Sequence, residues 1–178
     1  MKNILTILLF SILAFSCSKN DFENTKLYWE LDKETYQSTD NFELIIRVYP
    51  TEAEKTIRFY KDLNNIEISF VPNVEEFKSR EELKKRFIEG PPIFGDDSEY
   101  INEYTISKEK PFEKIFLGTI SESIDDIVFE IPELNIKNKI EKFFIQKNPN
   151  ILIKGKCSTV YGGKDKPFMS KEIKIILE

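Results

Sequence analysis

The chain has 178 residues, with 31 acidic and 26 basic side chains and a formal net charge of −5. This mildly acidic balance argues against nucleic acid as a partner, because nucleic-acid-binding proteins gather Lys and Arg on one surface. The chain contains no histidine, which excludes Ser-His-Asp and Cys-His catalytic groups and histidine-ligated zinc. Its six glycines form no phosphate-binding loop. We therefore expect a protein that is not an enzyme and that uses no cofactor.

The first seventeen residues have the pattern of an export signal. A positively charged start precedes an uncharged apolar run, residues 4–15, that is followed by a serine and Cys17. This run is shorter than the roughly 20 residues that a membrane-spanning helix needs, and it has the length of a signal-peptide apolar region. A cysteine at this point resembles the lipobox of bacterial lipoproteins, with Ala14 at the position where Leu is usual. The resemblance implies a signal peptide over residues 1–16; the alternative is a plain secreted protein with an incidental cysteine.

Lipidation of Cys17 would decide where the protein acts. In lipoproteins of this type the cysteine carries two or three acyl chains, and two chains are enough for stable anchoring because each buried methylene contributes roughly 0.8 kcal/mol. The resemblance therefore implies a membrane-bound protein of the bacterial envelope, at the outer membrane facing the periplasm or at the cell surface. Residues 17–26 are polar and lack periodicity, so they are predicted to form the lipidated N-terminus and a flexible tether. The folded domain is predicted over residues 27–178.

From residue 27 onward, apolar and polar residues alternate in short segments, the period of a half-buried β-strand. Turn-forming residues such as those at 38–41, 64–65 and 162–163 separate these segments. Seven or eight strands with one apolar face each predict two sheets packed face to face. The expected fold class is all-β, an antiparallel β-sandwich. The predicted inward residues are Leu27, Trp29, Leu31, Phe42, Leu44, Ile46, Val48, Ile57, Phe59, Ile66, Ile68, Phe70, Ile127, Phe129, Ile131, Ile173, Ile175 and Leu177, with a further strand between Ile115 and Ile120.

Cys157 is the one cysteine besides Cys17, so no intramolecular disulfide is expected after lipidation. It shares the apolar face of a predicted strand over residues 150–161 with Ile151 and Ile153. A buried thiol without a neighbouring base behaves as a small apolar group rather than as a nucleophile. We expect Cys157 to lie in the core.

Two segments have helical rather than strand patterns. Residues 73–89 are rich in charged helix-forming residues and end at a Gly-Pro-Pro sequence. Residues 135–148 place Ile136, Ile140, Phe143 and Phe144 on one helical stripe that ends at Asn148-Pro149. These segments predict one or two short helical insertions in the sandwich.

One part of the predicted sandwich resembles a known family. Tyr36, a polar turn over 38–41, Glu43, the strand 42–49 and a strand with Ile57 and Phe59 follow one another between residues 31 and 70. This order resembles the opening strands of bacterial immunoglobulin-like domains. The resemblance covers about a quarter of the chain and implies an immunoglobulin-like sandwich, but a fold likeness does not define a function.

Few residues suggest a ligand site. Asp96, Asp97 and Glu99 are candidates for calcium, and Asp125-Asp126 form a second acidic pair, but neither has the spaced pattern of a calcium loop. Tyr28, Tyr49 and Tyr60 are predicted to point outward, where rings on an exposed face can bind a glycan. Two functional classes therefore stay open. The first is a membrane-anchored lipoprotein that binds a protein or an envelope component, and the second is a binding module for a small ligand, a glycan or calcium.

Overall fold

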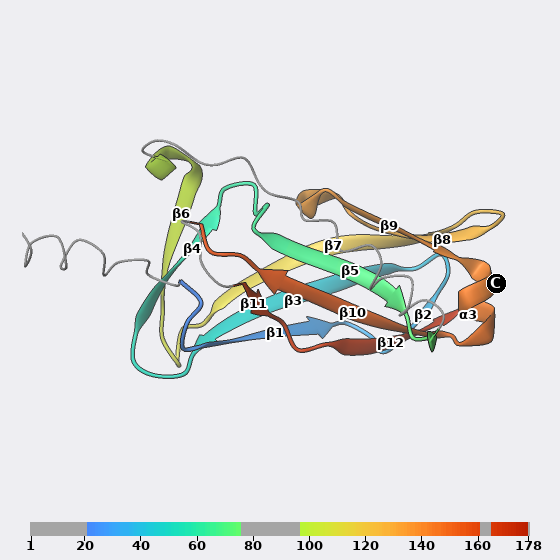
Figure 1. Cartoon of the computed structure of the whole chain (residues 1–178), viewed down its shortest axis with the longest axis horizontal. Helices are drawn as coiled ribbons and strands as arrows, with labels where there is room; N and C mark the ends of the chain where they lie inside the picture. Colours follow the sequence, from blue (N-terminus) through green and yellow to red (C-terminus); the bar gives the residue numbers. More distant parts are fainter. Residues whose placement is uncertain (1–20, 76–96, 161–164, 178) are drawn as a thin grey trace, which may run out of the picture.

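The computed structural model describes residues 21–75, 97–160 and 165–177, and two β-sheets packed face to face form its centre (Figure 1). The first sheet has the strand order β1-β3-β7-β8-β9. Its strands are β1 (Thr25–Leu31), β3 (Asn41–Pro50), β7 (Phe112–Glu122), β8 (Asp126–Ile131) and β9 (Ile136–Glu141).

In the second sheet the central strand is β10 (Asn150–Cys157), which has β5 (Ile66–Pro72) on one side. On its other side β10 pairs with β11 (Lys166–Pro167) and with β12 (Lys171–Ile176), and β12 pairs with β2 (Thr35–Gln37). A separate pair, β4 (Lys55–Tyr60) and β6 (Ile101–Ile106), lies at one end of the sandwich. The helical segments among the described residues are η1 (Asp97–Tyr100), η2 (Pro132–Leu134) and α3 (Lys142–Lys147).

The strand pairing confirms the predicted β-sandwich. Strands pair antiparallel throughout the described residues, except that β2 runs parallel to β12. Because β1 belongs to the first sheet and β2 to the second, the chain crosses between the sheets within residues 32–34.

The connections agree in part with those of an immunoglobulin domain. The order β5-β10-β12 corresponds to the C-F-G sheet of such a domain, and β1-β3 corresponds to strands A and B. In the A-B-E-D sheet of an immunoglobulin domain, however, the strand beside B is E, and E comes after its other neighbour, D, in the sequence. Here β7, which lies beside β3, precedes β8.

The apolar faces of the two sheets meet in one core, as the alternation of the sequence predicts. Most of the predicted inward side chains are buried, while Leu31 and Leu177 at strand ends are partly buried. Phe70 of the second sheet stacks on Phe129 of the first, with ring centroids 4.5 Å apart. Trp29 is 5% exposed and stacks on Phe168 at 3.7 Å. These aromatic contacts join the two layers.

The predicted helix over residues 135–148 is wrong in its first half. Residues 136–141 form β9, which pairs with β8 from Ile131↔Ile136 to Asp126↔Glu141, and a helix begins at Lys142. Ile136 and Ile140 are four residues apart, a spacing that suits one face of a strand as well as one face of a helix. The helix ends before Asn148, as predicted. Beyond Glu75, the predicted helix over 73–89 lies outside the described residues.

The predicted boundary between tether and domain also needs correction. Asp21, Phe22 and Thr25 are 1%, 0% and 2% exposed, and β1 begins at Thr25. The part of the tether that the structure describes, residues 21–26, therefore belongs to the folded domain. A single phenylalanine in a polar stretch produces no periodicity, so the sequence pattern did not indicate this packing.

Candidate interaction surfaces

The described chain enters the domain at one end of the sandwich, which we call the entering end. There β1 begins at Thr25, opposite the last residue of β3, Pro50. The same end contains the β4–β6 pair and the last residues of β10 (Figure 1). The opposite end, which we call the far end, contains the β2–β3 turn, the β7–β8 turn and α3 (Figure 1).

An ion cluster fixes the chain at the entering end. The Asp21 carboxylate lies 2.7 Å from Nη1 of Arg58 on β4, and Nε of Arg58 lies 2.6 Å from the Glu103 carboxylate on β6. Asp21 is almost completely buried, while Arg58 and Glu103 reach solvent. Burial raises the pKa of Asp21 more than its bond to Arg58 lowers it. The sequence offers no sign of this cluster, because its members are 37 to 82 positions apart.

Apolar packing and backbone bonds hold the same segment. The Phe22 ring packs against Phe59 of β4 with centroids 5.5 Å apart, and the Thr25 hydroxyl donates to the Phe22 carbonyl at 2.7 Å. The Thr51 amide donates to the Asn24 carbonyl at 2.8 Å. The Lys55 ammonium donates to the backbone carbonyl of Glu23. The side chains of Asp21, Phe22 and Thr25 are thus buried, and the backbone carbonyls of Glu23 and Asn24 bond neighbouring segments.

Large apolar side chains are exposed at the far end. Ile124 in the β7–β8 turn is 91% exposed, Phe143 of α3 is 53% exposed and Ile176 at the end of β12 is 40% exposed. The β7–β8 turn and α3 are linked directly, since the Lys142 amide donates to the Asp125 carbonyl at 2.8 Å. Ile176 is linked to the β2–β3 turn, where the Ser38 amide donates to the Ile176 carbonyl at 3.0 Å.

Charged side chains lie beside these apolar residues and link the segments that carry them. The Glu122 carboxylate bonds both the Lys142 ammonium, at 2.6 Å, and the Ser38 hydroxyl. The Lys147 ammonium lies 4.4 Å from the centroid of the Phe143 ring. We call Ile124, Phe143 and Ile176 the far-end surface; it combines exposed apolar side chains with a cation above an aromatic ring.

A second apolar area lies on the outer side of the first sheet. Ile45 and Ile115 are direct partners in the β3–β7 register, and Leu117 follows two residues along. Ile115 and Leu117 are 47% and 68% exposed. The sequence marked this strand as apolar but did not show which residues point outward, because apolar residues occupy both faces between Ile115 and Ile120.

Two of the three candidate tyrosines come together and the third does not. Tyr28 and Tyr49, on neighbouring strands of the first sheet, have ring centroids 5.9 Å apart in an edge-on arrangement. Tyr60 lies on β4, where its hydroxyl donates to the Val160 carbonyl at 2.9 Å. All three are partly buried.

The remaining sequence candidates show no common site. Cys157 is fully buried, and burial raises the pKa of its thiol, so it is the core residue that the alternation predicts. Asp96 and Cys17 lie outside the described residues, Asp97 begins η1 and Glu99 is exposed. Asp125 and Asp126 lie in and after the β7–β8 turn, where the Asp126 amide and carbonyl bond Ser123. Within the described residues, no group of three acidic or cysteine side chains is placed to hold a metal ion.

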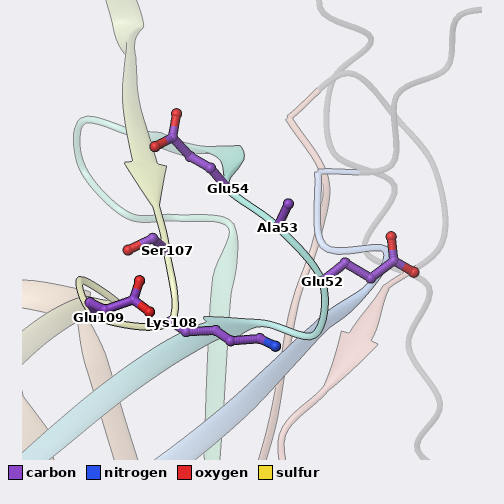
Figure 2. A pocket seen from close by; sticks show the side chains of 6 residues that line it. All are labelled: Glu52, Ala53, Glu54, Ser107, Lys108 and Glu109. Carbon is purple, nitrogen blue, oxygen red and sulfur yellow. The ribbon is translucent and has the colours of Figure 1, made fainter.

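A shallow hollow at the entering end separates two turns (Figure 2). Residues 52–54 of the β3–β4 turn form one wall and residues 107–109 of the β6–β7 turn form the other, around a volume of about 410 Å³. Its charged side chains are Glu52, Glu54, Lys108 and Glu109, all of them exposed. It is open to solvent and contains no buried polar group that a ligand would satisfy.

No family model matches the chain, and no curated protein matches its sequence. Among the described residues, no helix has both the length and the apolar composition needed to cross a membrane.

Proposed function

We propose that this chain is a non-enzymatic lipoprotein of the bacterial cell envelope that is anchored through lipid on Cys17 and binds a protein or another envelope component through its far-end surface. The observation that supports this proposal best is the separation of the two features. The chain enters the domain at Asp21, four positions after Cys17, whereas Ile124 and Phe143 are exposed at the opposite end.

The far-end surface has the properties of a protein-binding surface. Exposed apolar side chains that lie together are uncommon on soluble domains and mark contact surfaces when polar groups surround them. Turns at the ends of a sandwich carry binding residues because the sheets hold them in place. Here the Lys142–Glu122 ion pair and the Lys147–Phe143 contact surround the apolar groups.

The anchor is tested by following acylation. The wild-type chain is expected to incorporate a fatty-acid analogue and to fractionate with membranes, whereas Cys17→Ser should lose both properties. A wild-type chain that takes up no analogue and stays in the soluble fraction would contradict the lipoprotein assignment.

The far-end surface is tested with paired substitutions of exposed residues. Ile124→Ser with Phe143→Ser should abolish crosslinking to the partner in intact cells, while the circular dichroism spectrum keeps its β-sheet form. The matched control is Ile115→Ser with Leu117→Ser, which removes exposed apolar groups from the first sheet's outer side. If the control variant loses the crosslink and the far-end variant keeps it, the far-end assignment is wrong.

A further inference from the structure

We propose that the entering end of the sandwich lies directly against the lipid headgroups, so that the domain has a fixed orientation on the membrane. This inference rests on the proposed lipidation of Cys17. It adds an interaction surface, the turns over 51–54 and 107–110, and a partner of stated chemistry, the headgroup layer of the bilayer.

From Asp21 onward the chain is held by contacts with the rest of the domain. The Asp21–Arg58 ion pair, the Phe22–Phe59 contact and the Thr51–Asn24 backbone bond each join residues 21–25 to the β3–β4 region. Releasing this segment would expose the Phe22 ring and break a buried ion pair. Residues 18–20 are therefore the only positions between Cys17 and the segment that the domain holds.

The link between Cys17 and Asp21 is short. Four peptide units join Cys17 to Asp21, and a fully extended chain spans at most about 3.6 Å per residue. The lipidated residue therefore lies within about 14 Å of the Asp21 Cα atom. A ten-residue strand such as β3 is about 33 Å long at ~3.3 Å per residue, so the link is shorter than the sandwich it carries.

The turns at the entering end expose charged groups of both signs. The β3–β4 turn is attached to the entering segment through Thr51, and it exposes Glu52 and Glu54. The neighbouring β6–β7 turn exposes Lys108 and Glu109 (Figure 2). Lys110, the next residue, is exposed as well. Exposed groups of both signs match a layer of zwitterionic headgroups, which contains phosphate and ammonium groups together. Two strongly exposed apolar residues, Ile124 and Phe143, lie at the other end.

Contact quenching by headgroup-labelled lipids tests this orientation. The acylated protein is reconstituted into zwitterionic vesicles that contain nitroxide-headgroup lipid, with a fluorophore on Ala53→Cys at the entering end or on Ile124→Cys at the far end. Both positions are exposed, and Cys157 is buried and does not take up the label. We expect quenching at Ala53→Cys to be at least three times that at Ile124→Cys.

An insertion variant provides the control. Fifteen Gly and Ser residues placed between Asn20 and Asp21 should reduce the quenching at Ala53→Cys to the level at Ile124→Cys. Equal quenching at both positions without the insertion, stronger quenching at Ile124→Cys, or no effect of the insertion would overturn the orientation. Absence of quenching at both positions also overturns it. If acylation of the wild-type chain is intact, the orientation alone is wrong; if acylation is absent, the proposed anchor is wrong as well.

Discussion

Phe22→Ala tests most directly whether the entering segment is structural. The Phe22 side chain is 0% exposed and packs on the Phe59 ring at 5.5 Å. Removing a fully buried phenylalanine ring costs about 3–5 kcal/mol, since the transfer free energy is lost and a cavity remains. A domain of this size loses roughly 2–4 °C of melting temperature per kcal/mol. We therefore expect the melting temperature of the chain from residue 18 onward to fall by on the order of 10 °C.

Phe143→Ala is the matched control for this measurement, because it makes the same chemical change at a 53% exposed position. The loss in free energy of unfolding should stay near 1 kcal/mol or less, since the Phe143 ring is half exposed and no cavity forms when it is removed. Urea unfolding of both variants gives the free energies, and an unchanged denaturant slope confirms that the comparison is valid. If Phe22→Ala costs no more than Phe143→Ala, residues 21–25 behave as a tether and the short link is refuted.

Three further predictions concern the core and the buried ion pair. The pKa of Asp21 is raised above its ordinary 3.8 in the folded chain. Its contribution to the free energy of unfolding should therefore be greatest at low pH and fall as the pH rises through the folded pKa. Asp21→Asn should remove this pH dependence, which urea unfolding measures. Arg58→Met should lower the free energy of unfolding by about 3–5 kcal/mol near pH 7, because it leaves the buried Asp21 carboxylate without its cation. The loss should be smaller under acidic conditions, and an equal loss at both pH values would argue against the ion pair. Cys157 should resist thiol reagents in the native chain and react after denaturation, because it is fully buried and its thiol pKa is raised; rapid native labelling would contradict its place in the core.

The strands were predictable because each one carries its own apolar alternation. Phe42, Leu44 and Ile46, for example, are buried as the period-two pattern requires. The sequence was a weaker guide to which strands pair, because strand pairing depends on contacts between segments that are distant in the chain. Nothing local to residues 35–37 shows that β2 leaves the first sheet and runs parallel to β12, which lies more than 130 positions away.

The error at residues 136–141 has a definite physical origin. Ile136 and Ile140 satisfy a helical spacing of four, and they also satisfy the even spacing of one strand face. The intervening Lys137, Lys139 and Glu141 are exposed, which is the strand alternation. Pairing with β8, whose Ile127, Phe129 and Ile131 are fully buried, decides between the two patterns. A tertiary contact therefore overrode a local spacing that fitted both structures.

The candidate surfaces were less predictable than the fold. Tyr28 and Tyr49 were identified as outward-pointing, and the β1–β3 register brings them together. Ile124 was not identified, because a single isoleucine in a turn follows no period. Its position beside α3 depends on the bond from the Lys142 amide to the Asp125 carbonyl. The far-end surface thus exists only through contacts between segments, which sequence patterns do not report.

Burial of the entering segment connects anchoring with folding. A polar tether would leave the stability of the domain independent of its N-terminus, whereas here the first described residues supply a fully buried ring and a buried carboxylate. Thr25 is the first residue of β1, which pairs along seven residues with β3, its neighbour in the first sheet. With lipid on Cys17, as proposed, only four peptide units would join the anchor to the buried Asp21, so the domain would have little freedom to move away from the membrane. If Cys17 carries lipid as proposed, this short link favours a fixed position of Ile124 relative to the membrane, because β1 and the β7–β8 turn belong to the same sheet.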